Sequence, residues 1–211
     1  DISMEVMGSE SEMYVEGIRL SEKFGDVCTV KVPCTREGLK VCKALSDVGI
    51  RVNVTLIFCA SQAVLAAKSG ATYVSPFVGR LDDQSVAGLE VVRSISELYR
   101  IHGVRTQILS ASIRSVQRAV RSWYNGASIC TLPPKVFDQM YDHILTDKGM
   151  EQVLQLAEIK HVIYKLNRDF TREEFYDKFG KGSTFPRVIK DDTIIGGCTE
   201  TVKYLREQKL V

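Results

Sequence analysis

Short apolar segments alternate with longer amphipathic segments from residue 1 to about residue 145. Apolar runs bounded by glycine or polar residues are typical of buried β-strands, and apolar residues spaced three or four apart are typical of helices. The alternation predicts βα units, in which helices join successive parallel strands. The predicted strands are 2–6, 27–33, 51–58, 72–78, 106–112 and 128–132; the predicted helices are 11–24, 35–48, 61–69, 86–102, 115–125 and 134–143.

Polar residues recur in these apolar strands, each toward the strand's C-terminal half: Glu5, Lys31 and Thr55. The carboxyl ends of parallel strands meet at one edge of a sheet, and enzymes of the (β/α) barrel class carry their sites there. A full barrel has eight such units, and six are predicted here. The pattern favours a barrel with a site formed by these three residues.

Lys31 is the candidate catalytic residue, because the rest of the segment 27–33 resembles a strand with both faces buried. Burial disfavours the charged form of an amine, and a neutral amine can attack a carbonyl group to form a Schiff base. The alternative is a lysine at a strand end whose ammonium group reaches solvent. For Glu5 the alternative is a solvent-facing charge, and for Thr55 it is simple β-propensity.

Composition restricts the partners. With 45% apolar and 26% charged residues and a net charge of +2, the chain has no basic stripe for nucleic acid, so we expect a small-molecule partner. Six cysteines without a C-x-x-C pair indicate a reducing cytoplasm. The apolar runs fall short of the roughly 20 residues that cross a bilayer, and no signal peptide is visible, so no membrane partner is expected.

The pattern changes beyond about residue 150. A strand is predicted over 161–166, a capped helix over 171–179, a β-hairpin from 187–190 and 193–195, and a final helix over 199–208. Two short strands joined by an acidic turn are typical of an antiparallel meander. We therefore expect two domains, 1–150 and 151–211.

Three motifs carry a resemblance to a known family: Val-Lys-Val-Pro-Cys-Thr-Arg-Glu-Gly at 30–38, Asn-Val-Thr-Leu-Ile-Phe at 53–58 and Gly-Ala-Thr-Tyr-Val-Ser-Pro-Phe-Val-Gly-Arg-Leu-Asp-Asp at 70–83. Over residues 1–150 the chain resembles the short bacterial and phage transaldolases, a subfamily that also contains fructose-6-phosphate aldolase. The resemblance implies a class I aldolase type (β/α)8 TIM barrel whose first two βα units precede residue 1.

The resemblance also implies roles for individual residues. Lys31 would be the Schiff-base lysine, Glu5 and Thr55 would hold a water that shuttles protons, and Phe77 would border the site. The substrate phosphate would be held by Arg80, Ser112 and Arg114, which suits the bidentate binding of phosphate by arginine. For Arg80 the alternative is a surface ion pair with an acid such as Asp82.

The implied activity is that of a transaldolase of the pentose phosphate pathway, which moves a dihydroxyacetone unit between sugar phosphates without metal or organic cofactor. Aldolase members carry Gln in place of Glu5 and Tyr in place of Phe77, so these residues favour transaldolase. The family's Leu-Asp-Thr and Thr-Thr-Asn-Pro motifs do not occur in this sequence, so we expect impaired turnover. A homo-oligomer is expected for the intact family.

The tail, 151–211, resembles the C-terminal half of a glutaredoxin, through Ser-Thr-Phe-Pro-Arg-Val at 183–188 and Ile-Gly-Gly-Cys-Thr-Glu-Thr at 195–201. This resemblance implies a cis proline and a glutathione-binding set consisting of Thr184, Phe185, Pro186, Gly197, Cys198 and Thr199. The Cys-Pro-Tyr-Cys motif of that family is missing, so Cys198 lacks the paired thiol needed for disulfide exchange.

Three alternatives remain open beside transaldolase: fructose-6-phosphate aldolase, a non-catalytic fusion or fragment of the two families, and a glutathione-dependent redox protein. The redox protein ranks last because the dithiol is absent.

Overall fold

The chain divides into two compact units, residues 1–137 and 138–211. The computed structural model describes residues 2–141, 143–156, 158–183 and 185–210. The division lies before residue 150, where the sequence suggested a change of domain. The two domains expected from the sequence stay a prediction, and each compact unit is described by itself.

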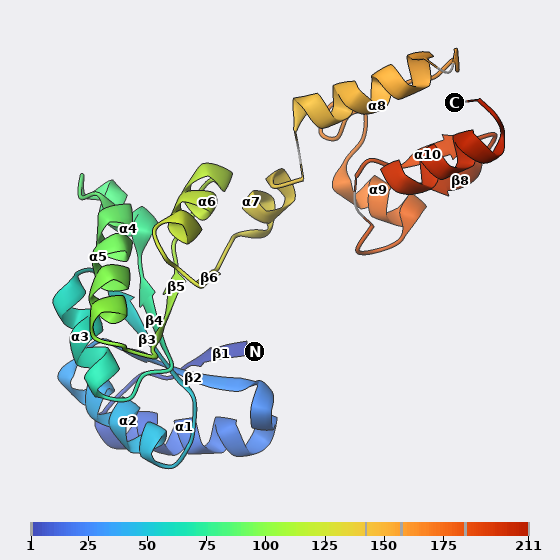
Figure 1. Ribbon diagram of the computed structural model, residues 1–211. Helices are drawn as coiled ribbons and strands as arrows, with labels where there is room; N and C mark the ends of the chain where they lie inside the picture. Colours follow the sequence, from blue (N-terminus) through green and yellow to red (C-terminus); the bar gives the residue numbers. More distant parts are fainter. Residues whose placement is uncertain (1, 142, 157, 184, 211) are drawn as a thin grey trace. The chain divides into compact units, whose positions relative to one another are not determined.

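The first unit is built on one sheet of six parallel strands in the order β1-β2-β3-β4-β5-β6 (Figure 1). The strands are β1 (Ile2–Glu5), β2 (Cys28–Pro33), β3 (Val52–Ile57), β4 (Tyr73–Pro76), β5 (Gln107–Ser110) and β6 (Ile129–Cys130). The helices are α1 (Glu10–Phe24), α2 (Arg36–Asp47), α3 (Ala60–Lys68), α4 (Val78–Asp83), α5 (Gly88–Ile101), α6 (Val116–Tyr124) and α7 (Pro134–Gln139), which ends just inside the second unit, and a 3-10 turn spans Gly25–Val27.

Local sequence signals start these helices. The Ser9 hydroxyl accepts a hydrogen bond from Glu12 N while the Glu12 carboxylate accepts one from Ser9 N, which is a capping box at the start of α1. Thr35 and Ser115 cap α2 and α6 through their hydroxyls alone, which accept from Gly38 N and Arg118 N. The predicted alternation of strands and helices in this unit is therefore confirmed, with boundaries shifted by a few residues.

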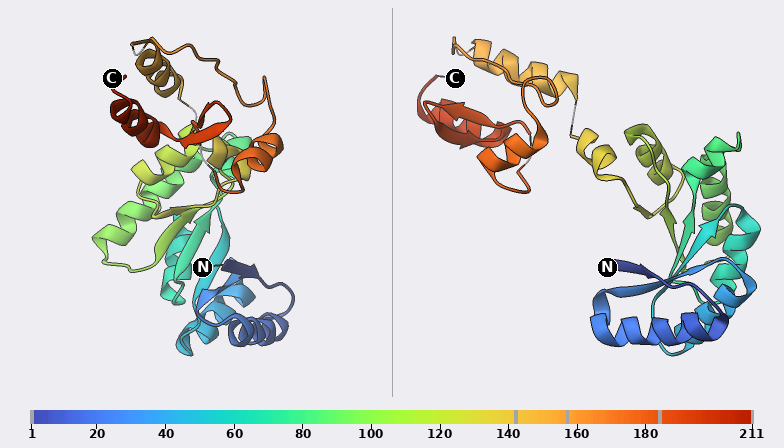
Figure 2. Two further views of the ribbon diagram at one scale, coloured as in Figure 1. Left: turned by 90° about the vertical axis from the view of Figure 1, so that its right-hand side faces the viewer. Right: turned by 180° about the vertical axis from the view of Figure 1, so that it is seen from behind.

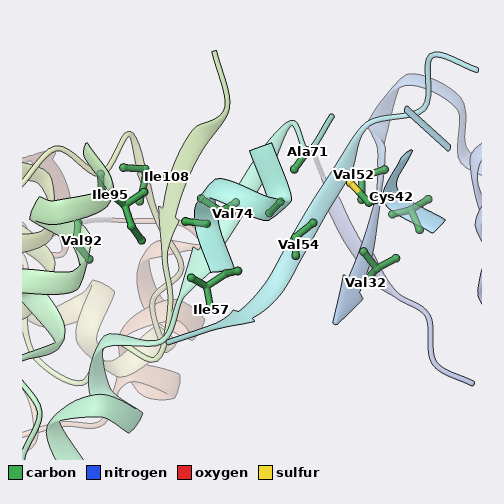
Figure 3. Close-up of a cluster of buried hydrophobic side chains, with 14 of the residues drawn as sticks. Val32, Cys42, Val52, Val54, Ile57, Ala71, Val74, Val92, Ile95 and Ile108 are labelled. Atoms are coloured by element: carbon green, nitrogen blue, oxygen red, sulfur yellow. The ribbon is translucent and has the colours of Figure 1, made fainter. Parts of the chain in front are cut away.

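The hydrophobic core lies between the sheet and its helices (Figure 3). Alternate residues of β2, β3 and β4, such as Val32, Val54 and Val74, are fully buried against side chains of the helices, including Cys42 and Ile95. Figures 1 and 2 show α1, α2, α3 and α5 along one side of the curved sheet. Because strand side chains alternate between faces, the opposite, concave face receives the residues between these valines.

Helix α4 was not predicted from the sequence. The predicted strand 72–78 ends at Pro76, and the chain turns at once into Val78–Asp83. Val78 N donates to Ala111 O and Gly79 N donates to Ser112 O, so the carboxyl end of β4 is tied to the residues that follow β5.

The second unit contains α8 (Ile144–Leu156), α9 (Arg172–Phe179), α10 (Cys198–Glu207) and an antiparallel hairpin of β7 (Val188–Lys190) and β8 (Thr193–Gly196). The predicted hairpin and the helices at 171–179 and 199–208 are confirmed. The strand predicted over 161–166 is wrong, since only Leu166 forms an isolated bridge there. Helix α8 was not predicted.

Aromatic rings form the centre of the second unit. Phe175 is buried, and its ring centroid lies 4.0 Å from that of Phe185 and 4.7 Å from that of Phe179. Rings at such separations contribute beyond the area that they bury. The Phe185–Pro186 peptide is cis, as the resemblance to glutaredoxin implied.

The fold of the first unit is thus α/β, with a parallel six-stranded sheet of the kind that forms part of a (β/α) barrel. Within the residues that the structure describes, no helix combines the length and apolar character needed to cross a membrane.

Candidate active site

Lys31 and Glu5 form an ion pair on the concave face of the sheet. They are directly opposite each other in the parallel pairing of β1 and β2, and Lys31 Nζ lies 3.1 Å from Glu5 Oε2. The two side chains are 23% and 45% exposed. The expectation of a strand buried on both faces holds for Cys28, Thr29, Val30 and Val32, but the Lys31 side chain is partly exposed, on the face opposite to the helices.

A hydrogen-bond network centred on Asn53 lies beside Lys31 on the same face. Asn53 pairs with Lys31 across β2 and β3, and its Oδ1 accepts a bond of 2.7 Å from the Ser75 hydroxyl. Its Nδ2 donates to Ser3 Oγ at 3.2 Å. Asn53 and Ser75 were not selected from the sequence, although each is a polar residue in an apolar strand, the same signal that identified Glu5.

Thr55 lies at the carboxyl end of β3 on this face. It is fully buried, and its Oγ1 has no hydrogen-bond partner among the residues that the structure describes. The next residue, Leu56, has a φ of 58° where the register of β3 with β4 shifts. A bulky residue in the left-handed region is an outlier, and such irregularities concentrate beside functional sites. The free hydroxyl is suited to a water or a substrate oxygen.

Phe77 and Arg80 lie at the carboxyl end of β4. The Arg80 guanidinium carbon lies 4.7 Å from the centroid of the Phe77 ring, and the Phe58 ring lies 5.9 Å from that of Phe77. Asp82 instead pairs with Arg118 at 3.2 Å. The surface pair of Arg80 with Asp82 is therefore not observed, and the Arg80 side chain is exposed for an anion.

Ser112 and Arg114 follow β5, next to the start of α4. The Ser112 backbone has a φ of 60°, and its carbonyl accepts a bond from Gly79 N. Both terminal nitrogens of Arg114 donate to the carboxylate of Asp83, and this ion pair holds the pKa of Asp83 below its usual value. Asp83 was also missed at the sequence level.

The structure therefore gathers the predicted residues into neighbouring groups at one edge of the sheet. Lys31 contacts Glu5, Phe77 contacts Arg80, and Ser112 and Arg114 converge on Gly79. Within the described residues, no hydrogen bond or ion pair joins Lys31 directly to Thr55 or to the two arginines. All of them follow or end parallel strands, whose carboxyl ends form one rim.

Two thiols flank this rim. Burial raises the pKa of Cys34, which follows β2, and the nearby Cys59 adds to this effect. Hydrogen bonding by the Ser61 hydroxyl lowers the pKa of the exposed Cys59, which precedes α3. Among the residues that the structure describes, no group of three or more His, Cys, Asp or Glu side chains is arranged to hold a metal ion.

The predicted glutathione-binding residues lie in the second unit. Phe185 packs on the buried Phe175, Gly197 N donates to Glu200 Oε2 at 2.9 Å, and Thr199 is exposed on α10. Pro186 is half-buried, and Cys198 is the first residue of α10. Thr184 lies outside the described residues. Glutathione binding stays a prediction.

Comparison with solved structures supports the fold. A GMP reductase from Trypanosoma brucei superposes with a TM-score of 0.50 at 18% identity, over 64% of this chain and 30% of that one. At this identity the likeness concerns the fold alone.

Comparison of sequences identifies the family. A probable transaldolase from Ruegeria pomeroyi is 49% identical over 166 residues, 78% of this chain and 75% of that protein. One from Geobacillus kaustophilus is 49% identical over 154 residues, which are 72% of each chain. The family model described as transaldolase/fructose-6-phosphate aldolase matches residues 1–178, which include part of the segment that resembles glutaredoxin. The chain belongs to the transaldolase/fructose-6-phosphate aldolase family.

Proposed function

We propose that this chain carries the chemistry of a transaldolase, which transfers a dihydroxyacetone unit between sugar phosphates through an imine on Lys31. The main support is the pair of Lys31 and Glu5 at 3.1 Å on the polar face of the sheet. This distance lies within the range for direct proton transfer between heavy atoms.

The pair supplies the nucleophile. Transfer of a proton from Lys31 Nζ to the Glu5 carboxylate leaves a neutral amine, which attacks the ketone carbon of the donor sugar. Loss of the carbonyl oxygen as water gives a protonated imine. Glu5 is the carboxylate in contact with Lys31 and is suited to return the proton that this water requires.

The imine then acts as an electron sink. Removal of the proton from the C4 hydroxyl breaks the C3–C4 bond, the aldose phosphate departs, and the dihydroxyacetone carbons stay on Lys31 as an enamine. Attack of this enamine on an acceptor aldehyde forms the new carbon–carbon bond, and hydrolysis frees the lysine. Thr55, whose hydroxyl has no hydrogen-bond partner in the part of the chain that the structure describes, is suited to orient the water used in these steps.

Residues at the carboxyl ends of the strands recognise the substrates. Arg80, Ser112 and Arg114 are the groups that we assign to the phosphate, since guanidinium groups bind phosphate oxygens with directed hydrogen bonds. Phe77 holds Arg80 against its ring and borders the sugar chain. The proposed setting is the pentose phosphate pathway in the cytoplasm, in a homo-oligomer.

Borohydride trapping tests the first step. Fructose 6-phosphate with borohydride should add a reduced adduct to Lys31, located by peptide mass mapping. Lys31→Arg keeps a cation beside Glu5 but should abolish the adduct, because guanidinium does not form this imine. Lys40→Arg is the matched control, since Lys40 also pairs with a glutamate, Glu10, at 2.9 Å but on the surface. Absence of an adduct from the folded parent chain would contradict the proposal and favour a non-catalytic fusion.

Fructose-6-phosphate aldolase is the second candidate, because the family contains both activities. Glu5 and Phe77 favour transaldolase over it. Product analysis separates them. Without an aldose phosphate acceptor, a transaldolase releases at most one equivalent of glyceraldehyde 3-phosphate per site, whereas an aldolase continues to release both glyceraldehyde 3-phosphate and free dihydroxyacetone.

A further inference from the structure

We infer that Asp83 is a positioning residue for phosphate recognition, holding the Arg114 guanidinium beside Ser112. This inference deepens the proposed function and rests on it. Asp83 is the last residue of α4, and Arg114 lies between β5 and α6. The pair therefore links the segments that follow two neighbouring strands.

Asp83 binds only the side of the Arg114 guanidinium formed by the two terminal nitrogens. Nη1 donates to one oxygen of Asp83 and Nη2 donates to the other. A guanidinium carries five N–H donors, so this bidentate pair occupies two and leaves three. Nε, the nitrogen on the opposite side from the carboxylate, has no acceptor among the described residues.

The Nε side of Arg114 lies close to Ser112 and Gly79. A Cβ atom placed on Gly79 would lie 3.0 Å from Arg114 Nε, 2.9 Å from Ser112 Oγ and 2.1 Å from Ser112 O, so these groups leave no room for a side chain at this position. Glycine here lets Arg114 and Ser112 lie close together at the rim. Phosphate bound beside the two residues would accept hydrogen bonds from the Arg114 N–H groups that Asp83 does not occupy and from the Ser112 hydroxyl.

Stabilisation of the fold does not account for the pair. Asp83 and Arg114 are 45% and 56% exposed, and exposed ion pairs contribute little to stability. Asp82 makes the structural contacts instead: one of its oxygens accepts from Gly88 N, at the start of α5, and the other pairs with Arg118 of α6, both at 3.2 Å. Asp83 is paired to Arg114 alone among the described residues.

Ordering of a long side chain before binding lowers its entropy loss on binding. Each immobilised, rotamer-rich side chain weakens binding by a factor of roughly 2 to 12. Asp83→Asn should therefore raise the concentration of fructose 6-phosphate that gives half-maximal borohydride-trapped adduct on Lys31 by roughly 2- to 12-fold. Trapping of dihydroxyacetone, which has no phosphate, should stay unchanged, and Asp83→Glu should restore much of the lost affinity.

The control is Asp47→Asn, which removes an acid from another exposed ion pair, with Lys43 on α2. It should leave both sugars unaffected. Equal weakening of both sugars by Asp83→Asn, no weakening of either, or tighter binding of fructose 6-phosphate would overturn the inference; the last result would mean that Asp83 competes with phosphate.

A second measurement separates this inference from the proposed function. Binding of inorganic phosphate to the full chain, measured by calorimetry, requires no imine chemistry. Weaker phosphate binding by Asp83→Asn supports the positioning role even if neither sugar is trapped, an outcome that would refute only the Lys31 chemistry. Unchanged phosphate binding would refute the positioning role even if trapping succeeds.

Discussion

Gly79→Ala tests the close approach of two segments at the rim. The added Cβ would lie 2.1 Å from the carbonyl oxygen of Ser112, well inside van der Waals contact and against backbone that cannot rotate away. The φ of Gly79 lies outside the left-handed region, so an alanine is not disfavoured by its backbone angles. Any cost therefore arises from the clash.

The magnitude follows from two effects of this clash. Forced separation of the segments carries an overpacking penalty, and it breaks the 3.1 Å hydrogen bond from Gly79 N to Ser112 O. Together these effects should lower the free energy of unfolding of the first unit by about 2 to 4 kcal/mol. For an ordinary urea dependence, the unfolding midpoint should fall by roughly 1 to 2 M.

The single tryptophan supplies the assay. Trp123 lies on α6, 40% exposed, so its fluorescence in a urea titration reports on the first unit. Gly149→Ala is the control: it lies on α8, its added Cβ meets no atom within 4 Å, and it should leave the Trp123 transition in place. A Gly79→Ala midpoint that matches that of the parent would refute the close approach.

Three further predictions concern single contacts. Ser75→Ala removes the partner of buried Asn53 Oδ1 and should cost about 1 to 3 kcal/mol in the Trp123 fluorescence titration; an unshifted midpoint would contradict the network. Because the thiolate is the reactive form and the pKa of Cys59 is lowered, Cys59 should react with iodoacetamide at lower pH than an ordinary thiol. It should also react faster than Cys42, whose pKa is raised by burial to about 12. Mass mapping that finds both cysteines labelled equally fast would contradict this prediction. Thr171→Ala removes the capping box of α9 and should destabilise that helix by about 0.5 to 2 kcal/mol, measured by amide hydrogen exchange; full protection in the variant would argue against it.

The regular elements of the first unit were predictable from local pattern. Valines at alternate positions of β2 and β3 face the helices, and this periodicity is visible in the sequence. Helix α4 was not predictable in the same way, since Val78 continues the apolar run of β4. The turn there depends on hydrogen bonds to residues 111 and 112, which are distant in the chain.

The error at 161–166 has a related cause. The segment is rich in residues of high β-propensity, Val162, Ile163 and Tyr164, but β-propensity depends on packing against neighbouring strands, and no strand in the described residues lies beside it. The hairpin at 188–196 was predictable because its two strands pair with each other across a short turn at Asp191 and Asp192, both of which have positive φ.

For the site, sequence identified residue types but not partners. Lys31 was selected because it interrupts an apolar strand, yet its pairing with Glu5 depends on the register of two strands separated by a helix. Asp83 gave no signal, because an aspartate at the exposed end of a helix is ordinary until the position of Arg114 is known. Such partnerships are three-dimensional and leave no local pattern.

The sequential order of the six strands has a consequence for biogenesis. Each strand pairs with the strand that precedes it in the chain, so the separation between contacting segments stays short. Each pairing closes a loop of one βα unit, which keeps its entropy cost lower than that of pairing between distant strands. Lys31 and Glu5 belong to the first such pair, β1 and β2, so all the chain that this contact requires is translated before the later strands.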